Sequence, residues 1–291
     1  MKKYIILTIA TTLIFSCSTD KKKAIEHYIK AKELYKNDDI KNASSEIDLA
    51  IKLDSSNLDF QIIKAKIITE TDNYELAIKI LKSLSSKKFK LDTVNFNIGS
   101  CYFSYGSHFL MKLNDEEKSN NSYEKALNYY NNAININTQY FDAYVEKQKV
   151  LHNLNRYDEA LVVLNTAINF FPDSTSLICN RGVEKMYLGD LTGAMTDLDK
   201  SIQSNKLDSL DFASAYRFRG NLFLKKGKPD QAINDLTNAL KYNPKDEYAL
   251  VTRAECYKEK GLKDKACEDY RKAADLGFVS IYETIKEYCV E

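Results

Sequence analysis

Residues 213–246 read ASAYRFRGNLFLKKGKPDQAINDLTNALKYNPKD, and this stretch decides the fold. Small and apolar residues recur in each half at three- and four-residue steps, at Tyr216, Gly220, Phe223, Ala232, Leu236 and Ala239. This spacing is typical of amphipathic helices. Gly227 lies between the halves, where it can end the first helix, and Pro244 lies where it would stop the second. The stretch therefore predicts two antiparallel helices that pack closely through small residues.

The same pattern recurs along the chain. One alanine marks the second half of each copy, at Ala43, Ala77, Ala126, Ala160, Ala194, Ala232 and Ala266. Their separations are 34, 49, 34, 34, 38 and 34 residues, which is a period of 34 with insertions of 15 and 4 residues. A fixed period of this length indicates a solenoid, which grows by contacts between neighbours and needs no single central core.

This pattern resembles the tetratricopeptide repeat over residues 24–280, most closely at 213–246 and 247–280. The resemblance implies an all-α, right-handed superhelical solenoid of about seven helical hairpins. The expected repeats are 24–57, 58–91, 92–140, 141–174, 175–212, 213–246 and 247–280. A C-terminal capping helix is expected over 281–291, with Ser280 and Glu283 forming a capping box at its start.

The two insertions are expected to behave differently. The longer one spans about residues 107–121, and its apolar start is predicted to extend a helix. Its second part, DEEKSNN from Asp115, is predicted to form a polar turn, with a disordered loop as the alternative. The shorter one, near residues 206–210, is expected to lengthen a loop between repeats.

The first residues indicate a targeting segment rather than part of the repeat. Lys2 and Lys3 precede a twelve-residue apolar stretch, residues 4–15, which is shorter than the roughly 20 residues that a membrane-spanning helix needs. Residues 14–17, Ile-Phe-Ser-Cys, resemble a bacterial lipobox. An ordinary secretory signal with an incidental cysteine is the alternative.

The lipobox resemblance implies a lipoprotein signal peptide over 1–16, removed before Cys17. Cys17 would then carry the lipid, and 17–23 would form a short tether. The chain is thus expected to be a lipid-anchored membrane protein of the bacterial cell envelope. Ser18 stands where some lipoproteins that stay on the inner membrane have Asp, so the outer membrane is the expected location.

Charge and cysteine content exclude several functions. Lys and Arg number 42 against 41 Asp and Glu, a balance that does not favour nucleic acid as a partner. The chain has no CxxC pair and no His close to a Cys, so no metal site is expected. The other cysteines are expected to be buried: Cys101, Cys179, Cys256, Cys267 and Cys289. In an exported protein a pair could form a disulfide, and the last three are the closest candidates in sequence.

No catalytic pattern is present. The three histidines, His27, His108 and His152, lie in different repeats, and none stands beside a plausible nucleophile. The nucleophile-elbow, zinc-protease and phosphate-loop patterns are missing from the sequence. The chain is therefore expected not to be an enzyme, to need no cofactor and to have no small-molecule substrate.

The remaining candidate is a binding surface. In the repeat family that the chain resembles, the first helix of each hairpin lines a concave groove that binds a peptide or helix of a partner. The corresponding residues here are Tyr28, Lys32, Tyr35, Ile62, Lys66, Thr69, Phe96, Ser100, Phe103, Val145, Lys149, His152, Asn153, Val183, Met186, Arg217, Asn221, Leu224, Val251 and Glu255. Some of the apolar ones are alternatively core residues.

Apolar side chains mixed with Lys and Arg suit a peptide with some negative charge. We therefore expect a protein-interaction scaffold whose partners are other envelope proteins. The alternative is an envelope lipoprotein that binds peptidoglycan or carbohydrate, against which the lack of any Trp argues.

Overall fold

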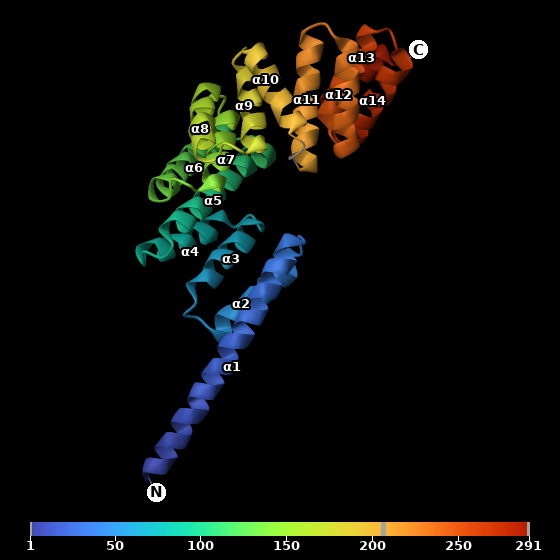
Figure 1. The fold of residues 1–291 in the computed structure, drawn as a ribbon. Helices are drawn as coiled ribbons and strands as arrows, with labels where there is room; N and C mark the ends of the chain where they lie inside the picture. Colours follow the sequence, from blue (N-terminus) through green and yellow to red (C-terminus); the bar gives the residue numbers. More distant parts are fainter. Residues whose placement is uncertain (1, 205–207, 290–291) are drawn as a thin grey trace. The chain divides into compact units, whose positions relative to one another are not determined.

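The computed structural model describes the backbone of residues 2–204 and 208–289, and side chains from Thr19 onward within these ranges. Over this part the chain is helical throughout and contains no strand (Figure 1). The prediction of an all-α fold is confirmed.

The chain divides into two compact units, Met1–Leu154 and Asn155–Glu291, which are described separately. The first contains α1 (Lys2–Lys36), α2 (Ile40–Leu53), α3 (Leu58–Thr69), α4 (Tyr74–Ser86), α5 (Leu91–Leu113), α6 (Glu116–Ile136) and α7 (Phe141–Asn153). The second contains α8 (Tyr157–Phe170), α9 (Thr175–Tyr187), α10 (Leu191–Gln203), α11 (Ser209–Lys225), α12 (Pro229–Tyr242), α13 (Glu247–Glu259), α14 (Lys263–Asp275), the 3₁₀ turn η1 (Val279–Ile281) and α15 (Tyr282–Tyr288).

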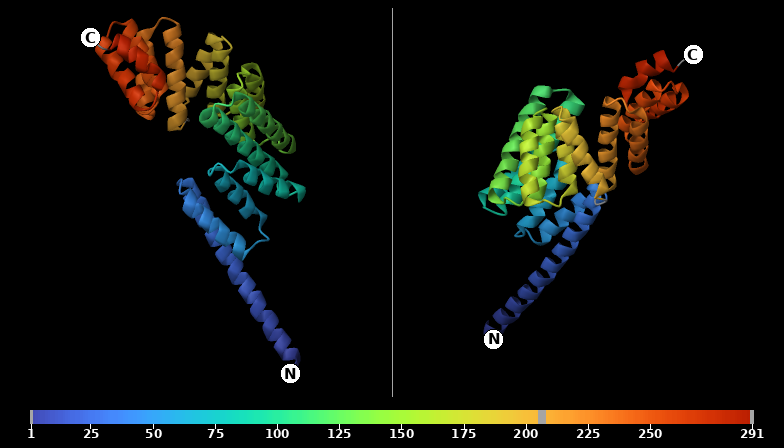
Figure 2. Two further views of the ribbon diagram at one scale, coloured as in Figure 1. Left: turned by 180° about the vertical axis from the view of Figure 1, so that it is seen from behind. Right: turned by 45° about the horizontal axis from the view of Figure 1, so that its top comes forward.

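Within each unit, consecutive helices pair as hairpins, and each hairpin packs on the next. In the first unit the hairpins are α1–α2, α3–α4 and α5–α6, and in the second they are α9–α10, α11–α12 and α13–α14. Figure 2 shows the helices of each hairpin side by side from two further directions. Contacts join sequence neighbours, as expected for a solenoid.

The alanines that set the repeat lie at the closest helix contacts. All seven, from Ala43 to Ala266, are fully buried. Opposite Ala232, glycine lets the two backbones approach, because a Cβ on Gly220 would lie 2.8 Å from Leu236 Cγ and 3.4 Å from the carbonyl oxygen of Ala232. The predicted packing through small residues is confirmed.

The turn inside each hairpin uses a left-handed residue. Gly227 and Gly261 have φ of +65° and +69°, as their spacing predicts. Asp38, Asp72 and Asn155 take the same place in earlier repeats with φ of +62°, +59° and +57°. Asp and Asn tolerate this conformation because their short polar side chains can form local hydrogen bonds. Glycine therefore marks this turn in only some of the hairpins, and Asp or Asn occupies the same place in others.

The long insertion does not form the predicted polar turn. Both helices of the third hairpin are long, and the connection between them is only Asn114 and Asp115. Asp115 accepts a hydrogen bond from the Lys118 backbone at 3.0 Å and so begins α6, with Glu116 and Glu117 in its first turn. Acidic residues stabilise a helix N-terminus. The DEEKSNN stretch is therefore a helix start, contrary to the prediction.

The short insertion also contributes to a helix. Residues 205–207 lie outside the described part of the chain, but Ser209 and Leu210 begin α11. Asp208 caps this helix by accepting from the Asp211 backbone at 2.8 Å. The expectation that residues 206–210 only lengthen a loop is wrong for Ser209 and Leu210.

The C-terminal cap forms, but not through the predicted capping box. Ser280 lies inside η1, and Ile281 precedes α15 without a side-chain cap. The segment is held instead by buried Ile281 and by a disulfide between Cys267 of α14 and Cys289. Cys101, Cys179 and Cys256 are free and buried, as predicted.

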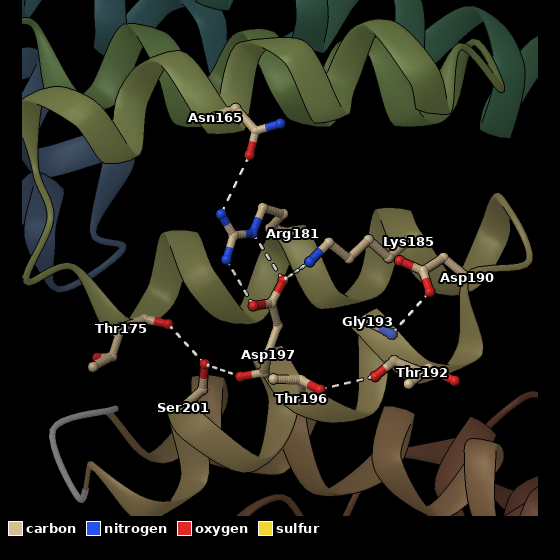
Figure 3. Close-up of polar contacts among 10 residues, drawn as sticks. All are labelled: Asn165, Thr175, Arg181, Lys185, Asp190, Thr192, Gly193, Thr196, Asp197 and Ser201. Carbon is tan, nitrogen blue, oxygen red and sulfur yellow. Dashed lines mark hydrogen bonds and ion pairs between the residues drawn. The ribbon is translucent and has the colours of Figure 1, made fainter.

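Buried ion pairs reinforce the hairpins of the second unit (Figure 3). Arg181 Nε and Nη2 donate to the two carboxylate oxygens of Asp197 at 2.8 and 2.7 Å, and Lys185 Nζ lies 2.8 Å from the same group. Arg181 Nη1 also donates to Asn165 of the preceding helix at 3.3 Å. The same arrangement recurs at Arg219–Asp235 and Arg253–Asp269. Each arginine thus joins both helices of its hairpin to the helix before it.

The N-terminal predictions stay predictions. Helix α1 runs through the expected signal peptide and tether, but the side chains of residues 1–18, that of Cys17 included, lie outside the described part of the chain. Within the described residues, no helix is both long enough and apolar enough to span a membrane.

Candidate peptide-binding groove

The first helices of successive hairpins form one face of each unit. In the first unit α1 contacts α3, α3 contacts α5 and α5 contacts α7, and in the second α9 contacts α11 and α11 contacts α13. Among the described residues, no contact of similar extent joins the second helices of successive hairpins. The first helices therefore converge, and they form the inner face on which the groove was predicted.

A cavity of about 180 Å³ opens on this face in the first unit. Tyr35 comes from α1, Lys66 and Thr69 from α3, and Phe96 and Ser100 from α5. All five are predicted groove residues, and they lie together although more than sixty positions separate the first from the last. The lining is completed by Glu70, Leu81, Asn97, Cys101 and Ser104.

Lys66 is the one cation among the described residues that line this cavity. Its amine forms no ion pair or hydrogen bond with any residue that the structure describes. Burial lowers the pKa of the Lys66 amine; nearby Asp142 opposes this shift and Lys32 adds to it. A cation that has lost part of its hydration and has no partner favours an incoming anion.

The other polar groups of the cavity mostly have partners. Tyr35 donates its hydroxyl to Glu70 at 3.0 Å, and burial together with this carboxylate raises the pKa of Tyr35. Thr69 Oγ1 donates to the Ala65 carbonyl at 2.9 Å and lies 3.1 Å from Cys101 Sγ. Burial raises the pKa of the Cys101 thiol to about 11, so this cysteine stays protonated and unreactive near neutral pH.

The remaining predicted groove residues of the first unit fall into different settings. Tyr28 packs on Phe60 with ring centroids 5.0 Å apart, and Lys32 Nζ lies 5.5 Å from the Tyr28 ring centre. Ile62 is buried in the core, so its side chain has little surface to offer a partner. Half-buried residues are Phe103, Val145 and His152; exposed ones are Lys149 and Asn153.

The second unit carries its own hollow of about 390 Å³ on the corresponding face. Predicted residues Asn221 and Leu224 of α11 and Met186 of α9 line it. The amide oxygen of Asn221 is buried and accepts no hydrogen bond from the described residues, so it is available to a donor such as a peptide N–H. Tyr187, Lys225 and Thr252 complete the lining.

Other predicted residues of the second unit are occupied by internal contacts. Arg217 Nε lies 3.1 Å from Asp246, and the guanidinium stacks 4.2 Å from the Phe218 ring centre. Glu255 accepts a hydrogen bond from the Tyr270 hydroxyl. Val183 is buried, and Val251 packs against the last core cluster.

Several lining residues escaped the sequence prediction. Asn97 and Cys101 each follow a predicted groove residue by one position, Phe96 and Ser100. Ser104 lies four residues after Ser100, so the helical period extended along α5 would have found it. Leu81 comes from a second helix, and the periodicity of first helices gave no sign of it.

The described residues of this face form no metal centre. In the described ranges, no three His, Cys, Asp or Glu side chains are placed to hold a metal ion. The expectation that the chain is not an enzyme stays a prediction. What the geometry offers is partly apolar hollows with a few polar groups, which suits binding.

The comparisons agree with this fold. A tetratricopeptide repeat family model matches residues 219–277. DnaJ homolog subfamily C member 3 of Bos taurus is 26% identical over 152 residues, which are 51% of this chain and 29% of that protein. Tetratricopeptide repeat protein 13 of Homo sapiens is 26% identical over 140 residues, 47% of this chain and 16% of that protein. The matched part is thus less than a third of either relative.

Solved structures extend the likeness to most of the chain. A tetratricopeptide repeat protein from Parabacteroides merdae aligns with a TM-score of 0.64 at 18% identity, covering 92% of this chain and 97% of that one. Yeast Tom70 aligns with a TM-score of 0.57 at 20% identity, covering 90% of this chain and 51% of that one. The chain is therefore a helical-repeat protein. Its repeat has the tetratricopeptide fold, which generally serves as a protein-interaction scaffold.

Proposed function

We propose that this chain is a non-enzymatic scaffold of the bacterial cell envelope, anchored to the outer membrane by a lipid on Cys17. Its inner face binds a peptide or helix of another envelope protein. The lipid holds the scaffold at the membrane surface, and the groove supplies specificity.

The first-unit cavity is the observation that carries this proposal. Side chains from three successive first helices meet there, which is how a repeat array presents a continuous surface to an extended ligand. Phe96 supplies an apolar wall, and Lys66 supplies a charge that has no partner in the part of the chain that the structure describes. The Asn221 hollow supports a second contact for a peptide backbone in the other unit.

Export is supported by the sequence and by the cysteines. Residues 14–17 resemble a lipobox, and a disulfide such as Cys267–Cys289 persists in oxidising compartments. Two or more acyl chains anchor a protein stably, whereas one is marginal.

In-cell photo-cross-linking tests the groove. A photoreactive phenylalanine analogue at Phe96 is expected to capture a discrete protein, and the same probe at Lys79 of α4, outside the cavity, is not. Cross-links only to material that a muramidase digests would favour the carbohydrate-binding alternative. Equal capture at both positions would contradict the proposal that the groove is the binding site.

Metabolic labelling tests the anchor. A clickable fatty acid is expected to label the wild-type chain and not the Cys17→Ser variant, which should also leave the membrane fraction. Undiminished labelling of the variant would refute the anchor and leave the groove proposal standing.

A further inference from the structure

We propose that Lys66 is the specificity determinant of the first-unit cavity and binds a carboxylate of the partner peptide, with an adjacent apolar residue packed on Phe96. The inference rests on the proposed function, since it names the chemistry of the ligand at that groove. Both an acidic side chain and a peptide C-terminus present a carboxylate, and the experiment below separates these two sources.

The first argument is the state of the Lys66 amine. Among the described residues that line the cavity it is the only cation, and it is partly buried without an ion-pair partner. Other predicted groove cations have neighbours: Arg217 lies beside Asp246, and Lys149 Nζ lies 2.8 Å from Glu146. The only same-sign neighbour that acts on the Lys66 amine is Lys32, which disfavours the charged form further. A carboxylate at this amine would offset both the lost hydration and the repulsion.

The second argument is that most other donors lining the cavity are already used. Asn97 Nδ2 donates to the Thr93 carbonyl at 2.7 Å, and Ser100 Oγ donates to the Phe96 carbonyl at 3.1 Å. Thr69 donates within α3. An anion entering the cavity therefore finds its strongest donor at Lys66, which has three N–H groups and no acceptor.

The third argument concerns orientation. Glu70 lines the same cavity and holds the Tyr35 hydroxyl at 3.0 Å. Its negative charge repels a carboxylate and attracts a peptide N–H. A ligand is therefore expected to place its carboxylate at Lys66 and its N–H groups towards Glu70.

Size and walls fit one side chain rather than a folded surface. The cavity measures about 180 Å³, room for a few water molecules, and half-buried Phe96 provides an apolar wall. Charge-assisted hydrogen bonds are about twice as strong as neutral ones, so a single contact here can dominate specificity.

Short peptides test the proposal directly. The probes are acetyl-Ala-Phe-Glu-Ala-amide, the same peptide with Gln in place of Glu, and the Gln peptide with a free C-terminal carboxylate. The full-length chain in detergent, with lysine labelled with carbon-13 at Cε, is titrated with each probe by NMR. The Lys66 signal is assigned from its loss in Lys66→Met.

Binding of the Glu peptide is expected to shift the Lys66 signal to saturation and to raise its pKa. The Gln amide should bind about tenfold more weakly, as loss of a charged hydrogen bond predicts. If only the free-carboxylate peptide binds tightly, the site takes C-termini; if only the Glu peptide does, it takes acidic side chains; if both do, it takes either carboxylate.

Variants separate charge from shape. Lys66→Met keeps the aliphatic stem and should weaken the Glu peptide about tenfold, while Lys66→Arg should retain binding. Lys79→Met, at an exposed lysine of α4 outside the cavity, is the matched control and should bind within about twofold of wild type. Thermal unfolding of each variant checks that it folds.

The inference is overturned if neither carboxylate-bearing peptide binds more tightly than the Gln amide, if Lys66→Met binds the tighter carboxylate peptide as wild type does, or if no peptide shifts the Lys66 signal. Protein capture at Phe96 that persists in Lys66→Met would leave the scaffold function intact and reject only the carboxylate site.

Discussion

Arg219 and Asp235 form a two-point ion pair across the α11–α12 hairpin, with Nε and Nη2 of the guanidinium 2.7 and 2.9 Å from the two carboxylate oxygens. The third arm, Nη1, donates to Asp199 of the preceding hairpin at 2.8 Å. A planar fork can satisfy three acceptors at once, which lysine cannot do in the same geometry. This pair therefore couples a hairpin to its neighbour as well as closing it.

Removal of the Arg219 side chain should be strongly destabilising. The Arg219→Met variant leaves Asp235, whose side chain is 2% exposed, as a buried charge without its partner. Breaking a buried pair costs about 3–5 kcal/mol, so we expect the free energy of unfolding in urea to fall by about 3 kcal/mol.

Two further variants control this experiment. Lys149→Met removes one partner of a surface pair and should leave the urea midpoint nearly unchanged. The double variant Arg219→Met, Asp235→Leu should recover part of the loss, because no charge stays buried. A loss below about 1 kcal/mol in the single variant would mean that water reaches Asp235.

The Asp197 pair predicts an acid-sensitive contribution to stability. Burial alone would raise the pKa of Asp197, but hydrogen bonds from Arg181 and Lys185 outweigh it and hold the pKa below its ordinary value. A carboxyl whose folded pKa is depressed stabilises the fold above its unfolded pKa of about 3.9, and this contribution is lost as pH falls through the folded pKa.

We therefore expect the stability difference between wild type and Asp197→Asn to be constant above about pH 5 and to shrink below about pH 4. Urea unfolding at several pH values measures it. Asp264→Asn, at an exposed position of α14, should show no such trend. A difference that persists unchanged to pH 3 would contradict the pairing.

Most of the fold could be predicted because one spacing controls it. Buried Ala43 and Ala266 stand at matched places in their repeats because every hairpin faces the same demand for close helix contact. The insertions could not be predicted in the same way, since Asp115 reads equally well as a turn residue or a helix cap. The structure decides between a turn and a cap, because both helices of this hairpin are long and leave only Asn114 and Asp115 between them.

The candidate site was predictable in part. The helical period placed Lys66 and Phe96 on first helices, and they share one cavity. The period could not show which charges are already paired. Arg217 lies beside Asp246, whereas Lys66 has no partner among the described residues, although both occupy groove positions. Whether a charge is paired depends on residues of the neighbouring hairpin, and the spacing of the repeat does not show which residues those are.

Gly99 should not tolerate a methyl group. A Cβ at this position would lie 2.7 Å from Tyr130 Cε1, and the Tyr130 ring is fully buried. Overpacking costs about 1–3 kcal/mol, against a gain of at most about 1 kcal/mol from the better helix propensity of alanine. Gly99→Ala should therefore lower the thermal midpoint, whereas Asn128→Ala on the exposed face of α6 should not. An unchanged midpoint would show that the Tyr130 ring can move aside.

The disulfide between Cys267 and Cys289 should control the stability of the end helix. It spans 22 positions in the sequence and ties the end of α15 to α14, where buried Ile281 and partly buried Ile285 and Tyr288 also pack on the core. A loop of this length corresponds to about 3 kcal/mol in the chain-entropy account. Reductant should therefore speed hydrogen exchange over residues 279–289 while leaving α11 and α12 protected. The Cys267→Ala, Cys289→Ala double variant should exchange fast in both conditions, so that reductant has no further effect on it. Equal protection of the wild-type segment with and without reductant would mean that packing alone holds the end helix.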